Sequence, residues 1–119
     1  MLTEKPIIER EKPPKRLRFA DPLPELVLSG EKNATWRIDD DKNLQIGDIL
    51  SLQRMDDTEF GRAEVTGIKD TKFGELTEED KIGHEKFLSD DDMLRTYSDY
   101  YNRAVFLDTS LKIVRFELK

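Results

Sequence analysis

The sequence predicts a single α+β domain in which five to six mostly antiparallel strands pack with about three short helices. A length of 119 residues lies in the usual size range of one domain, with room for one core and one main site. The hydrophobic residues, 36% of the chain, gather in short runs, some alternating with polar residues and some spaced as on a helix face. No internal repeat is present, so strand and helix patterns along one chain predict a mixed class.

Composition excludes several kinds of site. The chain has no cysteine, which excludes disulfides, thiolate zinc sites and cysteine nucleophiles. His84 is its one histidine, too few for the usual transition-metal ligand sets. No run approaches the roughly 20 apolar residues of a membrane helix. We therefore expect a cytoplasmic protein that needs no metal, no cofactor and no membrane.

Charge is unevenly distributed, although the net charge is -6. Residues 1–18 are net basic: Lys5, Arg10, Lys12, Lys15, Arg16 and Arg18 against Glu4, Glu9 and Glu11. The remainder is acidic, and an acidic body binds a phosphate backbone poorly. A nucleic-acid role would therefore need a local basic pocket or help from residues 10–18.

The amino-terminal segment, residues 1–15, is charged, contains three prolines and shows neither buried period. It is predicted to be a flexible arm, with the domain covering residues 16–119. Basic and apolar residues alternate over residues 15–20, which predicts a half-buried strand with Arg16 and Arg18 on its outer face.

A short helix is predicted next. Asp21 is a natural cap, Pro22 suits a first turn, and apolar residues 23, 26 and 27 share one face before Gly30 ends the helix. Residues 34–38 then alternate as a strand. Trp36 belongs to its core face, although an exposed tryptophan could instead stack on a base.

Two further strands, residues 49–54 and 62–68, are predicted to pair as an antiparallel hairpin across the polar loop 56–59. The turn 46–48 leads into the first of them. Gly67 in the second is typical of a bulge or bend.

Two capped helices and two strands complete the prediction. Thr77 and Ser89 each precede a helix with aspartate three residues later, which resembles a capping box. The second helix has an apolar stripe: Met93, Leu94, Tyr97 and Tyr101. Tyr100 lies off this stripe and is free to reach a cleft. Residues 105–107 and 111–118 are predicted strands.

The run Gly30-Glu31-Lys32-Asn33-Ala34-Thr35-Trp36-Arg37 fits the pattern G-x-K-x-x-T-x-R and resembles the signature of ASCH domains. The resemblance extends over most of residues 16–119. It implies a PUA-like small β-barrel, related to domains that recognise RNA, with a cleft of nucleoside size. Its predicted ligand-binding residues are Gly30, Lys32, Thr35 and Arg37 of the motif, together with Arg18 and Tyr100.

Some bacterial ASCH proteins look like amidohydrolases that remove the acetyl group of 4-acetylcytidine. Carried over by position, the catalytic residues would be Lys32, Thr35 and Glu85, with Glu78 or Glu79 as alternatives to Glu85. Other members have been proposed as ribonucleases or transcription coactivators. The resemblance thus implies binding of RNA or a modified nucleoside first, a metal-independent amidohydrolase second, and an interaction module in transcription or translation third.

Protonation decides what such a cleft can catalyse. Lys32 could act as a base toward Thr35 only if burial or Arg37 lowers its pKa. An ionised Glu85 nearby would favour the ammonium, so that Lys32 would stabilise an oxyanion and Glu85 would be the base. An activated water, oriented by Thr35, is equally compatible. His84, beside Glu85, is interpreted as a polar loop residue, with an acid/base role as the alternative.

Overall fold

The computed structural model describes residues 13–119, and every structural statement below refers to that part of the chain. Most of the arm expected at residues 1–15 lies outside the described residues. Lys15 is the first residue of strand β1 (Lys15–Phe19). The predicted strand at this position is therefore confirmed.

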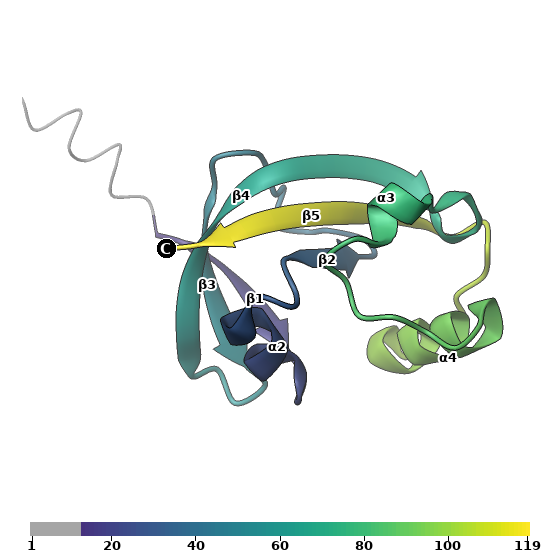
Figure 1. Ribbon diagram of the computed structural model, residues 1–119, viewed down its shortest axis with the longest axis horizontal. Coiled ribbons are helices and arrows are strands. Elements are labelled where there is room, and N and C mark those ends of the chain that lie inside the picture. The colour runs from purple at the N-terminus through teal and green to yellow at the C-terminus, as the bar shows by residue number, and fades with distance from the viewer. Residues whose placement is uncertain (1–12) are drawn as a thin grey trace, which may run out of the picture.

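One curved sheet organises the molecule. Its other strands are β2 (Ala34–Arg37), β3 (Ile49–Arg54), β4 (Glu59–Lys72) and β5 (Ser110–Leu118). The strand order is β1-β3-β4-β5-β2. β1 is parallel to β3 and the other neighbours are antiparallel, so the sheet is mixed. Figure 1 shows β4 and β5 arching together along the molecule, which gives the sheet the form of a half-barrel.

The predicted hairpin of β3 and β4 is confirmed, with Ser51 opposite Arg62. The predicted irregularity at Gly67 is also confirmed, because the register between β4 and β5 shifts between Val65 and Gly67. Strand β4 continues to Lys72, beyond the predicted end, since its last residues still pair with the start of β5.

Helix α2 (Leu23–Ser29) ends where predicted, because Gly30 has the left-handed conformation (φ 88°) and its N–H donates to the carbonyl of Val27. The prediction of Asp21 as its cap is wrong. Pro22 occupies that position without a side-chain hydrogen bond. The N–H of Leu23 donates instead to the backbone carbonyl of Ala20, which satisfies one of the free N–H groups of the first turn.

The other helices are the 3₁₀ turn η1 (Phe73–Glu75), α3 (Glu78–Lys81) and α4 (Asp90–Tyr101). The capping box of Thr77 with Asp80 is confirmed at α3. Only half of the second box forms. Ser89 accepts from the N–H of Asp92, but the Asp92 carboxylate accepts from Leu88 rather than from Ser89.

The prediction of a strand at residues 105–107 is wrong, because this segment is a loop. A turn forms between Phe106 and Thr109, in which the Phe106 N–H donates to the threonine hydroxyl and the Thr109 N–H to the Phe106 carbonyl. The carbonyl of Leu107 accepts from Gly74. These bonds use the backbone groups that a strand pairing would need.

The apolar side chains form two clusters. The first joins β1, α2, β3, β4 and the second half of β5, and the second joins β2, η1, α4 and the start of β5. Trp36 is 3% exposed in the second cluster, as predicted for a core residue. Figure 1 shows α2 and α4 both below the arch of β4 and β5. Within residues 13–119, no helix is long and apolar enough to cross a membrane.

Candidate functional site

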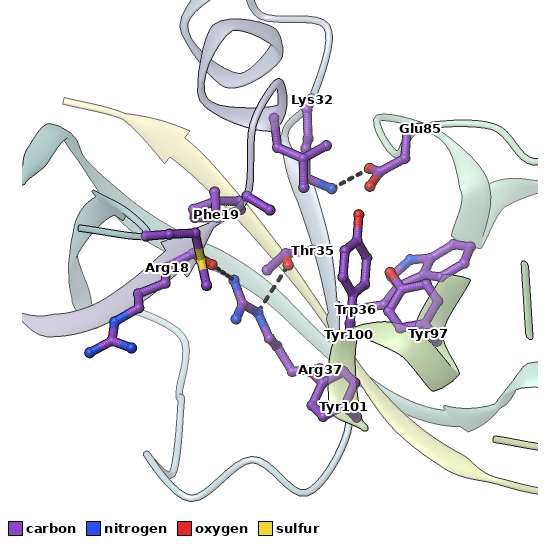
Figure 2. A pocket seen from close by; sticks show the side chains of 13 residues that line it. Arg18, Phe19, Lys32, Thr35, Trp36, Arg37, Glu85, Tyr97, Tyr100 and Tyr101 are labelled. Atoms are coloured by element: carbon purple, nitrogen blue, oxygen red, sulfur yellow. Dashed lines mark hydrogen bonds and ion pairs between the residues drawn. The ribbon is translucent and has the colours of Figure 1, made fainter. Parts of the chain in front are cut away.

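A cleft of about 210 Å³ lies between the two apolar clusters (Figure 2). Elements far apart in the sequence line it: β1, the start of α2, β2, the β3–β4 turn, the loop after α3, and α4. Its lining includes Arg18, Phe19, Lys32, Thr35, Trp36, Arg37, Glu85, Tyr97, Tyr100 and Tyr101. The cleft is therefore a product of the tertiary structure.

Lys32 is held at the inner end of the cleft. The left-handed turn at Gly30 lets the chain fold back, and the N–H of Lys32 donates to the carbonyl of Leu26. The side chain is 3% exposed, and its Nζ donates to the carbonyl of Ala34 at 2.8 Å and to Glu85 Oε1 at 2.5 Å. The lysine is thus an oriented donor with a carboxylate partner.

Glu85 reaches Lys32 because the loop after α3 is fastened to β2. The carbonyl of Gly83 accepts from the N–H groups of Asn33 (2.8 Å) and Ala34 (3.1 Å). Gly83 has φ 79°, and a Cβ there would lie 1.9 Å from Asn33 Oδ1. Only glycine fits this crossing without displacement of the asparagine.

The pKa values of Lys32 and Glu85 are determined by burial and by the attraction between the two charges. Burial lowers the pKa of Lys32, while the charge and the hydrogen bond of Glu85 oppose that effect. Burial alone would raise the pKa of Glu85, but the neighbouring Lys32 charge and other contacts hold it below its ordinary value. Glu85 is consequently a carboxylate at neutral pH, beside an ammonium whose proton burial makes easier to release.

Arg37 forms the opposite wall and orients Thr35. Its Nε donates to Thr35 Oγ1 at 3.0 Å, and Nη2 donates to the carbonyl of Arg18 at 3.1 Å. The guanidinium also lies 5.1 Å from the centre of the Phe19 ring. Because the Thr35 hydroxyl accepts from Arg37, its own proton remains to be donated elsewhere.

Aromatic rings from α4 close the third side. Tyr100 is 49% exposed at the rim, where the sequence placed it, whereas Tyr97 is buried. The hydroxyl of Tyr101 accepts from the N–H of Ile38, which ties α4 to β2. The buried indole nitrogen of Trp36 has no hydrogen-bond partner within the described part of the chain.

His84 does not line the cleft but packs against two residues that do, a supporting position that sequence reasoning missed. Its ring stacks on Trp36, with centroids 3.7 Å apart, and its Nε2 lies 3.0 Å from the hydroxyl of Tyr97. Burial and, next, the charge of Lys32 lower the pKa of His84 to about 4, so the ring is neutral at neutral pH. His84 lies in a loop, as the sequence indicated, but no periodic pattern marks its burial.

Comparison with solved structures gives close fold matches at low identity. An ASCH domain of Lactobacillus crispatus matches with a TM-score of 0.69 and 16% identity, over 96% of this chain and 84% of that one. A DUF984 protein of Enterococcus faecalis matches with a TM-score of 0.74 and 17% identity, over 98% of this chain and 84% of that one. A ZmASCH variant of Zymomonas mobilis matches with a TM-score of 0.60 and 15% identity, over 86% of this chain and 66% of that one. The chain has an ASCH-like fold.

No family model matches the sequence, and no curated protein matches it. The likeness to ASCH domains is therefore one of fold, as the resemblance of residues 30–37 implied.

The cleft brings together most of the predicted site residues: Arg18, Lys32, Thr35, Arg37, Glu85 and Tyr100. Gly30 does not line it, and instead borders a hollow on another side of Lys32. Glu78 and Glu79 also lie outside its lining, and Glu85 is the carboxylate bound to Lys32. Sequence reasoning omitted Phe19 and Met55, which also line the cleft. They do so because β1 and the β3–β4 turn pack next to β2, which no local pattern indicates.

Proposed function

We propose that the cleft binds a nucleobase, either of single-stranded RNA or of a modified nucleoside. The observation that carries this proposal is the buried Lys32–Glu85 pair, which borders a cleft with aromatic walls. A buried ion pair is a weak source of stability, because desolvation offsets the attraction. As a recognition device it offers an N–H donor and a carboxylate acceptor side by side.

The chemistry of a nucleobase matches this lining. Its edge carries both acceptors for Lys32 and donors for Glu85, and its face can stack on an aromatic ring such as Tyr100. The volume of about 210 Å³ lies below the roughly 300–1,000 Å³ typical of sites for larger ligands. A single base therefore fits the proposal better than a larger ligand. The likeness of the motif to ASCH domains, relatives of PUA-like RNA-recognition domains, adds support.

Trp36 provides the test, because it is the one tryptophan of the chain and lines the cleft. Its fluorescence is titrated with the four ribonucleosides and with short single-stranded RNAs at low salt. Saturable binding is expected for at least one of them, weakened about tenfold or more by Glu85→Gln. Arg95→Ala, an exposed cation remote from the lining, is the matched control. A protein that binds none of these probes would overturn the proposal.

Amide hydrolysis is the second candidate, favoured by the gathering of Lys32, Thr35 and Glu85 at one cleft. Glu85 would accept the proton of the attacking oxygen, from water or from Thr35. Lys32 would stabilise the oxyanion formed at the acyl carbonyl. The C–N bond then breaks and the nitrogen leaves as an amine with that proton. Attack by water gives the free acid directly, whereas attack by Thr35 gives an ester that water must hydrolyse.

Hydrolysis is tested with 4-acetylcytidine, by following cytidine through chromatography. Release of cytidine that Lys32→Ala abolishes would support this candidate, and release unchanged by Lys32→Ala would exclude the cleft as its site. Mass spectrometry of the quenched protein distinguishes the two routes, since only attack by Thr35 leaves an acylated chain. If the protein binds nucleosides but hydrolyses no acylated nucleoside, the hydrolysis candidate is excluded and the binding proposal stands.

A further inference from the structure

A second hollow of about 400 Å³ opens beside the cleft, on the side away from Glu85. Its lining consists of Arg16, Arg18, Arg37, Lys42, Gln53 and Asp57. Four cations thus face one carboxylate in a chain whose net charge is -6. This local reversal of charge is the arrangement that an acidic protein needs in order to attract an anion.

The hollow and the cleft adjoin each other. Arg18 and Arg37 line both of them, and Arg37 forms the partition between the two. Figure 2 shows the guanidinium of Arg18 extending away from Lys32 and Glu85, beyond Arg37. A ligand with its base in the cleft would therefore direct its sugar and its substituents past Arg37 toward these cations.

Several cations of the hollow are available for binding. Arg37 uses Nε and Nη2 for protein acceptors, and its Nη1 has none among residues 13–119. Arg16 is exposed and has no ion pair within this range. Among the residues that the structure describes, Lys42 Nζ pairs only with Asp41, at 4.0 Å. Guanidinium groups with free N–H donors are the usual ligands of phosphate oxygens.

We propose that this hollow binds the phosphate of a nucleotide whose base lies in the cleft. The ligand class would then be a nucleotide, either free or within an RNA strand, and not a nucleoside alone. This inference rests on the proposed nucleobase site and adds to it the group that the basic hollow recognises. Phosphate contacts are also the part of such binding that depends most strongly on salt.

Asp57 is the one carboxylate in the lining of the hollow, and its Oδ1 lies 2.7 Å from Arg18 Nε. A phosphate would compete with this carboxylate for the guanidinium. Replacement by asparagine removes the competition and keeps the backbone, since Asp57 has φ 71°, a conformation that asparagine also adopts. Asp57→Asn should therefore strengthen phosphate binding.

The test compares, by Trp36 fluorescence, each ribonucleoside with its 5′-monophosphate, its 3′-monophosphate and a dinucleotide that contains it. At low salt the best phosphorylated probe should bind about tenfold more tightly than its nucleoside. This advantage should shrink as ionic strength rises toward about 0.15 M. A preference for a monophosphate indicates a free nucleotide, and a preference for the dinucleotide indicates RNA.

Three variants test whether the tighter binding of nucleotides depends on the hollow. The ratio of nucleotide to nucleoside affinity should fall to about one in Arg16→Ala/Lys42→Ala, rise severalfold in Asp57→Asn, and stay as in the wild type in Arg95→Ala. Equal binding of nucleosides and nucleotides would overturn this inference and leave the nucleobase proposal intact. An advantage that survives in Arg16→Ala/Lys42→Ala would overturn it as well. Absence of binding by every probe would overturn both proposals.

Discussion

The imidazole of His84 lies flat against the indole of Trp36, with ring centroids 3.7 Å apart and ring planes 12° from parallel. The stack joins the loop that carries Glu85 to the strand that carries Thr35 and Arg37. A hydrogen bond between His84 and the hydroxyl of Tyr97 extends the connection to α4. Two walls of the cleft are thus held by one buried, neutral histidine.

Acid should destabilise the fold through this histidine. Burial first, and the charge of Lys32 next, lower the pKa of His84 to about 4 from its ordinary 6.5. Between these values the unfolded chain binds a proton that the folded chain does not. The stabilisation that depends on neutral His84 should therefore be fully present above pH 6.5. The free energy of unfolding should fall by about 3 kcal/mol in total as the pH drops to about 4.

Denaturant unfolding at a series of pH values checks this, with His84→Phe as the control that keeps a stacking ring without a titrating group. Glu85, whose folded pKa is also lowered, is present in both proteins, so its contribution is common to the two curves. The slope of wild-type stability against pH should exceed that of His84→Phe. Parallel curves would show that His84 is not the group responsible.

Breaking the buried pair should cost more than removing it. Lys32→Met leaves the Glu85 carboxylate, with 19% of its side chain exposed, without its partner, and should lower the free energy of unfolding by about 3 kcal/mol. Adding Glu85→Gln should recover part of that loss. The measurement is a double-mutant cycle by chemical denaturation. Strictly additive effects would contradict the coupling.

A surface pair serves as the control for that cycle. Lys119 and Glu64 lie 2.8 Å apart, but their side chains are 47% and 38% exposed. Lys119→Met should change the free energy of unfolding far less than Lys32→Met, because solvent screens exposed charges.

Gly83→Ala should detach the Glu85 loop from β2. Its Cβ would collide with Asn33, and the left-handed backbone adds strain of about 1 kcal/mol. We expect lower thermal stability and weaker binding of the ribonucleoside probes. In an Asn33→Ala background the collision is absent, so Gly83→Ala should cost less there. An equal cost in both backgrounds would exclude the collision as the cause.

Arg37→Lys should behave almost like Arg37→Ala, although it keeps the positive charge. A lysine cannot span Thr35 Oγ1 and the Arg18 carbonyl as the planar guanidinium does. Affinity for the best ribonucleoside should fall about tenfold in both variants. Arg62→Lys, at a surface pair with Glu59, is the matched control and should bind as the wild type does. Wild-type affinity in Arg37→Lys would show that charge alone suffices.

Local signals in the sequence predicted much of the fold. The left-handed stop at Gly30, the capping box at Thr77 and the bulge near Gly67 each depend on a few neighbouring residues, and all three are present. The errors at Asp21 and at residues 105–107 have the opposite origin. There, backbone groups take partners that a propensity pattern does not reveal.

The sequence by itself determined the helix stop before Lys32, the shared face of Thr35 and Arg37, and the core position of Trp36, because strand alternation and turn chemistry are local. Only the tertiary structure decided that Glu85, rather than Glu78 or Glu79, contacts Lys32 across 53 positions of the chain. It also placed the basic hollow beside the cleft. Both depend on the crossing at Gly83 and on the parallel pairing of β1 with β3, which long-range packing selects and no short pattern encodes.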